Sequence, residues 1–451
     1  MLSGDEGPGT TLLTGGHVYT GDEEGTEHAD GWLLIRNGVV DAVGSGSEPA
    51  AERQIDLGGA LVTPGLVNTH HHLYQTLTRA RAQQADLFTW LRELYPLWGR
   101  IDAEAEYAAA RTGLAELALS GCTTVFDHHY VFPPGRPGIV EAEIQAAREL
   151  GVRIVASRGS MDLGESKGGL PPDDIVEETD DVLAETERLA GLHDAGPGAR
   201  VQIAAAPCSP FSVTRQLMED SAALARRLGL RLHTHLAETV EEHDYCQREH
   251  GCSPVEYLGE LGWLEGDVWC AHCVHFTPDE IRSFALAGTG VAHCPSSNMR
   301  LGAGIAPVRA MLDAGVPVGL GVDGSASNER GDLSLDVRQA LLVARTREGP
   351  AAMTTREALG LATSGGAAVL GRDDIGSLAP GKQADVAVWR TDGLEFAGVG
   401  DLVAGWVLSA PHHVDRLLVA GEEVVRDGVL VCADEDEIAR HHREHARRFE
   451  T

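Results

Sequence analysis

The chain has 451 residues, 43% of them hydrophobic, and a formal net charge of −32 at pH 7. This length is enough for a large core and for more than one domain. The acidic balance argues against nucleic acid and anionic membranes as partners, because both are negatively charged. No apolar stretch reaches transmembrane length, and the first residues lack the basic region of a secretory signal. The eight cysteines show no small-domain spacing, which favours reduced thiols. We therefore expect a cytoplasmic protein without a membrane partner.

Both ends of the chain are expected to be rich in β-strands. In the N-terminal part, Asn37 and Gly38 stand between two apolar runs, and this pair suits a type I′ hairpin turn. Near the other end, apolar runs at 384–389, 417–420 and 423–425 show the same pattern of short predicted strands. Two strand-rich ends most simply form one domain. The sequence therefore predicts a small composite β-sandwich from residues 1–63 and 376–451, which includes a polar helix over 434–450.

Eight short apolar runs lie between these ends, and amphipathic helical patterns separate most of them. The runs cover 65–72, 122–128, 152–158, 200–207, 231–238, 268–272, 290–294 and 317–323. The helical patterns include 217–228, 280–286 and 335–345. Near-continuous apolar strands that alternate with helices indicate a parallel sheet covered on both faces. Eight such units predict a closed (β/α)8 TIM-type barrel over residues 64–375.

Polar residues end four of these predicted strands, at 68–72, 235–238, 271–272 and 322–324. In a TIM-type barrel the chemistry takes place at this end of the strands. His70 and His72 alternate on the first strand, so both imidazoles are expected to point the same way. Together with His235 and Asp323 they match the nitrogen and oxygen ligands of a catalytic zinc or iron ion. The alternative is four unrelated clusters, which an ordered quartet in matching context disfavours.

These segments resemble those of the amidohydrolase superfamily, and the resemblance covers nearly the whole chain. The motifs that point to its aminohydrolase branch are Pro64-Gly65-Leu-Val-Asn68-Thr-His70-x-His72, His235-x-x-Glu238, Ala271-His272-Cys-Val and Gly321-Val-Asp323-Gly-Ser-Ala-Ser-Asn328. Further motifs look like those of 8-oxoguanine deaminases, namely Asp127-His128-His129-Tyr130, Arg158-Gly-Ser-Met161, Ala206-Pro207-Cys208-Ser-Pro-Phe211 and His293-Cys294-Pro-Ser-Ser-Asn298.

The resemblance implies one divalent metal per chain, with zinc as first choice and Fe²⁺ or Mn²⁺ as alternatives. Its ligands would be His70, His72, His235 and Asp323. Zinc lowers the pKa of a bound water from 15.7 toward about 7. In this chemistry Asp323 accepts the proton of the water and His272 orients that water. Glu238 protonates the ring nitrogen beside the attacked carbon and then helps to protonate the leaving amine.

Five residues are expected to bind the substrate. Gln75 follows the metal histidines at a place where guanine deaminases also carry glutamine, and its amide suits a nucleobase edge, although it could equally cap a helix. Trp90, in the long segment after the first strand, could stack on a flat heterocycle. His129, Arg158 and Cys208 end the second, third and fourth predicted strands, so each is expected to face the site.

Three functions remain open from the sequence. The first is a purine-base deaminase that converts 8-oxoguanine to urate and ammonia. The second keeps the chemistry but changes the substrate to guanine, isocytosine, a cytosine-like base, S-adenosylhomocysteine or a chlorotriazine. S-adenosylhomocysteine deaminases carry histidine and arginine where this chain has Cys208 and Leu170, which favours a bare base. The third is a non-catalytic scaffold, but none of the metal ligands is missing. The expected partners are a small nucleobase and further copies of the chain in a dimer or larger homo-oligomer.

Overall fold

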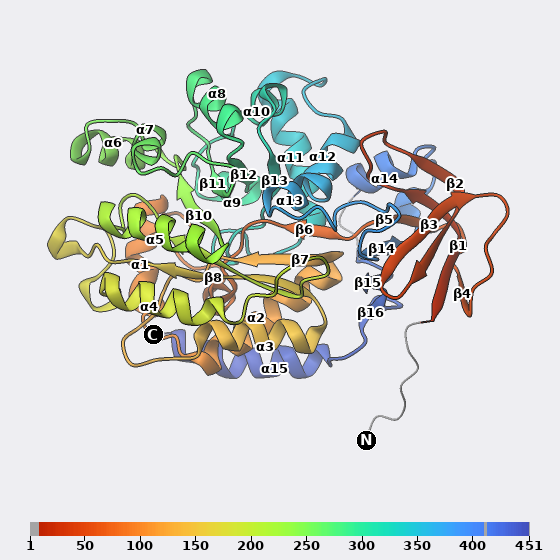
Figure 1. Ribbon diagram of the computed structural model, residues 1–451, viewed down its shortest axis with the longest axis horizontal. Coiled ribbons are helices and arrows are strands. Elements are labelled where there is room, and N and C mark those ends of the chain that lie inside the picture. Colours follow the sequence, from red (N-terminus) through yellow and green to blue (C-terminus); the bar gives the residue numbers. More distant parts are fainter. Residues whose placement is uncertain (1–8, 410–412, 451) are drawn as a thin grey trace.

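Eight parallel strands close into a barrel in the computed structural model, which describes residues 9–409 and 413–450. The barrel strands are β6 (Leu66–Asn68), β7 (Cys122–Asp127), β8 (Arg153–Ser160), β9 (Val201–Pro207), β10 (Arg231–Leu236), β11 (Val268–His272), β12 (Gly290–His293) and β13 (Val318–Leu320). They follow one another around the barrel in chain order, and β13 closes it by pairing with β6 (Figure 1). Each strand overlaps one of the eight apolar runs, so the predicted barrel is confirmed.

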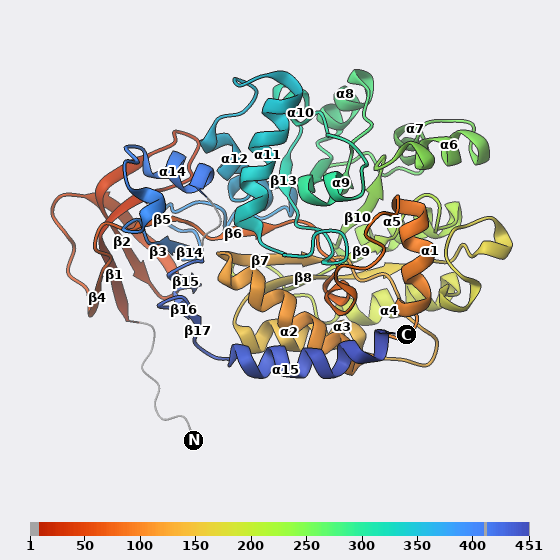
Figure 2. The same ribbon diagram turned by 180° about the vertical axis from the view of Figure 1, so that it is seen from behind.

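Helices surround the barrel (Figures 1 and 2). They are α1 (Leu87–Trp98), α2 (Ala103–Leu119), α3 (Ile139–Leu150), α4 (Thr179–Ala190), α5 (Arg215–Leu228), α6 (Val240–Glu249), α7 (Pro254–Glu260), α8 (Pro278–Ala287), α9 (Pro295–Arg300), α10 (Val308–Ala314), α11 (Leu333–Glu348), α12 (Thr355–Leu361) and α13 (Ser364–Val369). The three predicted helical patterns lie within α5, α8 and α11. Local signals set their limits: Thr277 and Glu280 form a capping box that starts α8, and Gly288, in the left-handed region, ends it.

The two chain ends form one nine-stranded sheet beside the barrel. Its strands are β1 (Thr10–Tyr19), β2 (Glu27–Arg36), β3 (Val39–Ser45), β4 (Arg53–Asp56), β5 (Leu61–Pro64), β14 (Val386–Trp389), β15 (Arg416–Val419), β16 (Glu422–Arg426) and β17 (Val429–Leu430). Asn37 and Gly38 both have positive φ, of 53° and 76°, and form the predicted turn between β2 and β3. The antiparallel pair β5–β14 joins the N-terminal and C-terminal halves. The composite β domain is therefore confirmed, whereas its boundaries at 63 and 375 stay predictions.

After the sheet the chain returns to the barrel. The predicted terminal helix is present as α15 (Glu435–Ala446), and it lies along α2 (Figure 2). Glu437 on α15 pairs with Arg111 on α2 at 3.0 Å, and the ring of His442 contacts the carbonyl of Thr76 at 3.1 Å. A second late helix, α14 (Leu402–Ser409), precedes β15. Within the described part of the chain, no helix is both long and apolar enough to cross a membrane.

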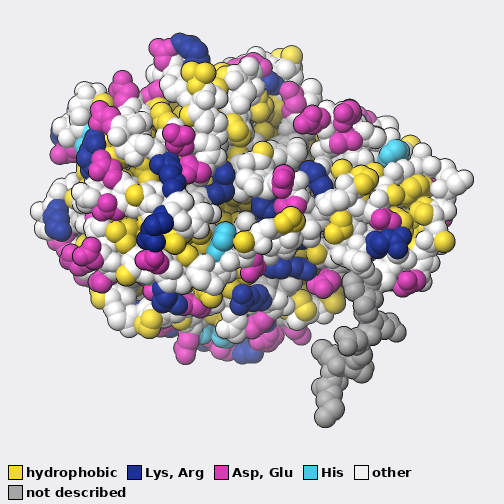
Figure 3. Space-filling model, in the orientation of Figure 1, with side chains coloured by type: hydrophobic (Ala, Val, Ile, Leu, Met, Phe, Trp, Pro, Cys, Tyr) yellow, Lys and Arg dark blue, Asp and Glu magenta, His cyan; other side chains and the backbone are white. Residues whose placement is uncertain are grey.

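Basic side chains are scattered among acidic ones on the face shown in Figure 3, rather than gathered into one patch. The expectation that nucleic acid is not a partner stays a prediction from the composition. The expected homo-oligomer stays a prediction.

A buried ion pair ties the sheet domain to the barrel. Arg153, at the start of β8, binds the carboxylate of Asp385 with two nitrogens, at 2.8 and 3.0 Å. The same guanidinium donates to the carbonyl oxygens of Gly198 and Ala199, and Asp385 also accepts from the backbone N–H of Ala420. Both charged side chains are buried. Two planar groups that match in this way leave few of their hydrogen-bonding atoms without a partner.

We expect Asp385→Ala to destabilise the protein strongly, because it leaves the buried guanidinium without its counter-charge. Removing one partner of a buried pair costs about 3–5 kcal/mol of unfolding free energy. The urea midpoint of unfolding measures this effect. Asp392→Ala is the matched control, since Asp392 pairs with Arg390 at the surface and both side chains are more than two-thirds exposed. Equal midpoints for the two variants would contradict the structural role of the buried pair.

Candidate metal centre

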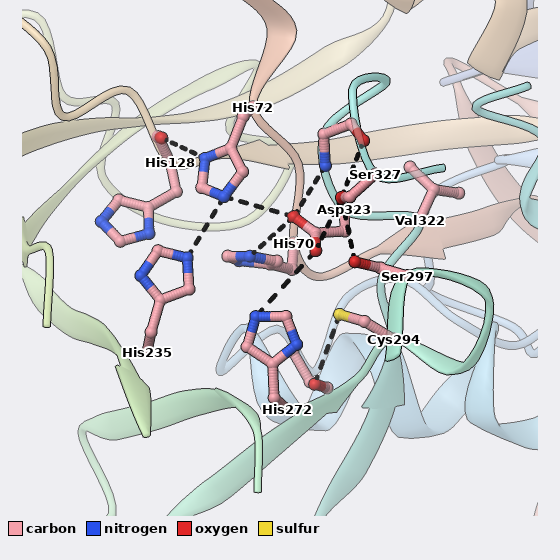
Figure 4. Close-up of polar contacts among 12 residues, drawn as sticks. His70, His72, His128, His235, His272, Cys294, Ser297, Val322, Asp323 and Ser327 are labelled. Atoms are coloured by element: carbon pink, nitrogen blue, oxygen red, sulfur yellow. Dashed lines mark hydrogen bonds and ion pairs between the residues drawn. The ribbon is translucent and has the colours of Figure 1, made fainter. Parts of the chain in front are cut away.

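Four segments meet at the C-terminal ends of β6, β10, β11 and β13 (Figure 4). His70 and His72 do not lie on the strand as expected, because β6 ends at Asn68. The segment after β6 is nevertheless held in place by its neighbours. The N–H of Thr69 donates to Leu320, and the carbonyl of His70 accepts from the N–H of Asp323 at 3.0 Å. Both imidazoles still point into the same site, as the alternation predicts.

The reactive ends of three imidazoles and one carboxylate converge there. The Nε2 atoms of His72 and His235 are 3.2 Å apart. Oδ1 of Asp323 lies 3.4 Å from Nε2 of His70 and 3.3 Å from Nε2 of His72. All four side chains are buried. The structure therefore brings the four predicted ligands together.

Hydrogen bonds show which nitrogen of each ring carries the proton. Nδ1 of His72 donates to the carbonyl of His128 at 2.6 Å, and Nδ1 of His235 donates to the carbonyl of Cys208 at 2.7 Å. A carbonyl oxygen can only accept, so Nδ1 carries a proton in both rings, and in a neutral ring Nε2 is then a bare lone pair. Two acceptors that face each other at 3.2 Å repel unless a cation lies between them.

His70 also carries its proton on Nδ1, and here the acceptor is the ring of His233. His233 donates from Nδ1 to the carbonyl of Trp269 at 3.0 Å, so its Nε2 accepts the Nδ1 proton of His70, also at 3.0 Å. Nε2 of His70 is then a buried acceptor aimed at Asp323. Burial lowers the pKa of His70 to about 3, so the ring is neutral at physiological pH. Three bare nitrogens and a carboxylate fit a divalent cation, and the groups that hold their Nδ1 protons fix the rings in that orientation.

The backbone at this site is strained. Ala237, His272 and Asp323 all have positive φ, of 49°, 73° and 64°. His272 is the last residue of β11, and Ala237 and Asp323 lie just beyond the ends of β10 and β13. The left-handed region is costly for side chains other than glycine. The sharp turn at Asp323 also lets the N–H of Gly324 donate to Oδ1 of Asp323 at 2.7 Å. The barrel thus stabilises a local conformation that turns these side chains toward one point.

Glu238 and His272 stand beside the four ligands. Nε2 of His272 is 3.5 Å from one carboxyl oxygen of Glu238 and 4.0 Å from Asp323. Nδ1 of His272 lies 3.0 Å from Oδ1 of Asn298, which holds the ring in place. The other oxygen of Glu238 has no hydrogen-bond partner among the described residues. Burial, and then the charge of Asp323, raise the pKa of Glu238 well above its usual range. This shift favours the protonated form of Glu238.

A cavity opens in front of these groups, and three of the predicted substrate-binding residues line it. They are Gln75, Trp90 and Cys208. Gln75 is buried, and its side-chain oxygen has no hydrogen-bond partner within the described chain. Gly324 makes room for this amide, because a Cβ atom there would collide with it. The indole N–H of Trp90 donates to the carbonyl of Ala326 at 3.2 Å, which fixes the ring at the cavity wall.

The structure places His129 and Arg158 elsewhere, contrary to expectation. Neither lines the cavity. Arg158 pairs with Glu177 at 2.5 Å, and its guanidinium lies 3.8 Å from the ring centre of Phe132. His129 is turned toward Glu106 between the helices. Successive residues in extended chain point to opposite sides, so the residue next to His129 faces the cavity instead.

That neighbour is Tyr130, and it lines the cavity together with Tyr95 and Phe211. None of the three is among the residues that the sequence predicts for substrate binding. Tyr130 and Phe211 belong to motifs that the sequence does single out. For Tyr130, the alternation of side chains after His129 is a signal that the sequence offers, whereas Phe211 lies in a turn, where alternation does not apply. Leu87, Leu91 and Leu301 complete the apolar part of the wall.

We expect His235→Ala to lose the ion of this centre, because one of three converging nitrogens is removed. Metal bound per chain, measured by mass spectrometry of the digested protein, should fall by one. His243→Ala is the control, since His243 is an exposed histidine on α6, outside the centre. If His235→Ala keeps all of its metal while remaining folded, the ligand assignment is wrong.

Comparison with known proteins agrees with this geometry. The Amidohydrolase family matches residues 61–447. The 8-oxoguanine deaminase of Pseudomonas aeruginosa is 49% identical over 421 residues, which cover 92% of this chain and 94% of that protein. An isoxanthopterin deaminase from an unknown prokaryotic organism is 40% identical over 450 residues, 95% of this chain and 93% of that protein. The crystal structure of atrazine chlorohydrolase from Arthrobacter aurescens complexed with zinc aligns with a TM-score of 0.92 and 35% identity, over 97% of this chain and 100% of that one. Matches of this length show that the chain belongs to the amidohydrolase family, as an enzyme with a histidine and aspartate centre for a divalent metal ion.

Proposed function

We propose that the protein is a purine-base deaminase, which converts 8-oxoguanine and water into urate and ammonia. The observation that carries this proposal is the position of Glu238. It is buried at the wall of the cavity and beside the ligand set, one of its oxygens has no partner among the described residues, and burial raises its pKa, which favours the acid form. Such an acid can protonate a ring nitrogen of a cyclic amidine. That protonation makes the neighbouring amine-bearing carbon electrophilic and prepares the loss of ammonia.

One ion, with zinc as first choice, would be held by His70, His72, His235 and Asp323. When bound, it supplies Lewis-acid activation of a water molecule. Oδ2 of Asp323 lies 4.0 Å from Nε2 of His272, so it is positioned to take up the proton of an attacking water. His272 is buried and its Nδ1 is engaged by Asn298, which leaves Nε2 to orient that water. Glu238 protonates the ring nitrogen, takes up the proton of the new hydroxyl group as the carbonyl forms and delivers it to the leaving amine. The proton held by Asp323 then restores the acid form of Glu238.

The cavity suits a flat, uncharged ring. Trp90, Tyr130 and Phe211 provide aromatic surface, and such faces stack well on heterocycles. Among the described residues that line it there is no lysine or arginine, so it offers no counter-charge for a phosphate. Burial raises the pKa of Cys208 to about 12, which keeps its thiol neutral. A free base therefore fits better than a nucleotide.

Gln75 supports recognition of the amidine edge. Its buried oxygen lacks a donor, and a purine amine or ring N–H could supply one. The identity to an 8-oxoguanine deaminase favours that base. Isoxanthopterin is the second candidate, because a deaminase of that name is also similar and the compound shares the amidine and carbonyl edge of guanine.

We expect Glu238→Gln to lower kcat by at least about 100-fold, because the amide keeps the shape but cannot donate the proton. Bound metal should stay unchanged, since Glu238 is not a ligand. Glu241→Gln, at an exposed position on α6, is the matched control and should keep full activity. Loss of metal from Glu238→Gln would show that the proposed role is wrong.

We expect 8-oxoguanine to be deaminated with a higher kcat/KM than guanine. The 8-oxo group turns N7 from an acceptor into an N–H donor and adds an acceptor at C8. A site that pairs with both would leave its own polar groups unmatched when guanine binds. Isocytosine, which shares the amidine and carbonyl edge, should react to some degree. Steady-state release of ammonia from these bases and from isoxanthopterin measures the order. An equal or higher value for guanine would refute the 8-oxo assignment but not the deaminase.

A further inference from the structure

A second group of buried titratable side chains lies outside the cavity, between α2, α3 and the end of β7. It consists of Glu106 on α2, Asp127 and His129 at the end of β7, and Glu143 on α3. Each of the four is 0% exposed. One ligand atom from each lies within 4.8 Å of the others. None of them lines the cavity, and the proposed deamination does not use them.

Most of the oxygen atoms in this group lack a hydrogen-bond donor. Within residues 9–409 and 413–450, both carboxyl oxygens of Glu106, both of Glu143 and one of Asp127 have no partner. No arginine or lysine forms an ion pair with any of these carboxylates in the same ranges. A single proton shared between Glu143 and Asp127 would satisfy only that pair. Buried, unpaired carboxylates are costly, so the group calls for a cation or for several added protons.

His129 gives an independent indication of a ligand. Its Nε2 donates to the carbonyl of Val131 at 2.8 Å, which in a neutral ring leaves Nδ1 as a bare lone pair. Nδ1 is aimed at Glu106, 3.4 Å from its carboxylate, but makes no hydrogen bond. In a neutral ring this acceptor faces other acceptors, and its opposite nitrogen is tied to a carbonyl. Burial opposes protonation, but Glu106 and Asp127 raise the pKa of His129 above its usual value, so Nδ1 calls for either a cation or an added proton. The histidines of the first metal centre show the same pattern.

We propose that Glu106, Asp127, His129 and Glu143 bind a second divalent cation. Three carboxylates and one imidazole form a hard, mainly oxygen ligand set, which suits Mn²⁺ or Fe²⁺. A doubly charged ion would offset most of the negative charge of the group. The chain would then hold two ions, not the single ion that the family resemblance implies. This proposal does not depend on which base is the substrate.

The second ion would position the first metal centre. Asp127 accepts the N–H of Leu73 at 2.6 Å, directly after the ligand His72. The residue after Asp127 is His128, and its backbone carbonyl accepts the Nδ1 proton of His72. A cation bound to Asp127 and His129 would therefore fix both acceptors that orient His72. The four side chains would act through this segment and would not touch the substrate.

The test is the metal content of the full-length protein. Chelated protein is reloaded with Mn²⁺, freed of excess metal and analysed for metal per chain. We expect two ions in the wild type and one in the double variant Glu106→Gln/Glu143→Gln. His235→Ala should also hold one, but it loses the ion of the first centre. Glu141→Gln is the matched control, because it makes the same change on α3 at a residue that instead pairs with Arg188 at the surface. It should keep two ions.

Two further measurements separate a cation from added protons. In crystals of the wild type grown with Mn²⁺, anomalous scattering should show a peak among the four side chains, and no peak there would overturn the proposal. When Glu106→Gln/Glu143→Gln is added to the His235→Ala protein, the rise in melting temperature that Mn²⁺ gives His235→Ala alone should disappear. If protons fill the group, glutamine replaces a carboxylic acid closely. The wild type would then hold one ion, and the double variant would melt at the same or a higher temperature.

Discussion

The metal centre depends on where three histidines place their single proton. Each ring donates from Nδ1 and so presents a bare Nε2 to the same point. Two of the acceptors are backbone carbonyls, of His128 and Cys208, which follow the ends of β7 and β9, the strands next to β6 and β10 in the barrel. A carbonyl in this position cannot rotate away as a side chain can, so the polarity of His72 and His235 follows from the barrel itself. Without these hydrogen bonds a ring could adopt the other tautomer, with the proton on Nε2, and then could not bind the ion through that nitrogen.

The same strand ends carry the strained residues. Ala237, His272 and Asp323 occupy the left-handed region without being glycine, and each lies at or just beyond the end of a strand that is paired on both sides. Rigid pairing below the site stabilises a turn that an isolated peptide would avoid. Glu242 adds to this, because its carboxylate accepts the N–H groups of Ala237 and Glu238. Fold and chemistry are therefore linked through the backbone, and the catalytic side chains inherit their directions from it.

Sequence patterns predicted the parts of the structure that local signals determine. The eight apolar runs, the Asn37-Gly38 turn and the four ligand segments were each readable from a few adjacent residues. His129 and Arg158 were not, because the direction of a side chain beyond a strand end depends on which neighbours it meets. Glu106 and Glu143 look like ordinary helix residues in the sequence, and only the packing of α2 against α3 buries them together. His233 was within reach, since it stands two residues before His235 on the same strand.

The composite sheet also sets the order in which the protein can be completed during synthesis. β5 ends at Pro64, but its partner β14 begins only at Val386. Ribosomes add roughly 5–20 residues per second, so the edge of β5 waits on the order of tens of seconds for its neighbour. During that interval β1, β2 and β3 can pair locally, while one open strand edge remains available to other chains. The barrel, which lies wholly between the two halves, is synthesised in the same interval and can close before the sheet that flanks it.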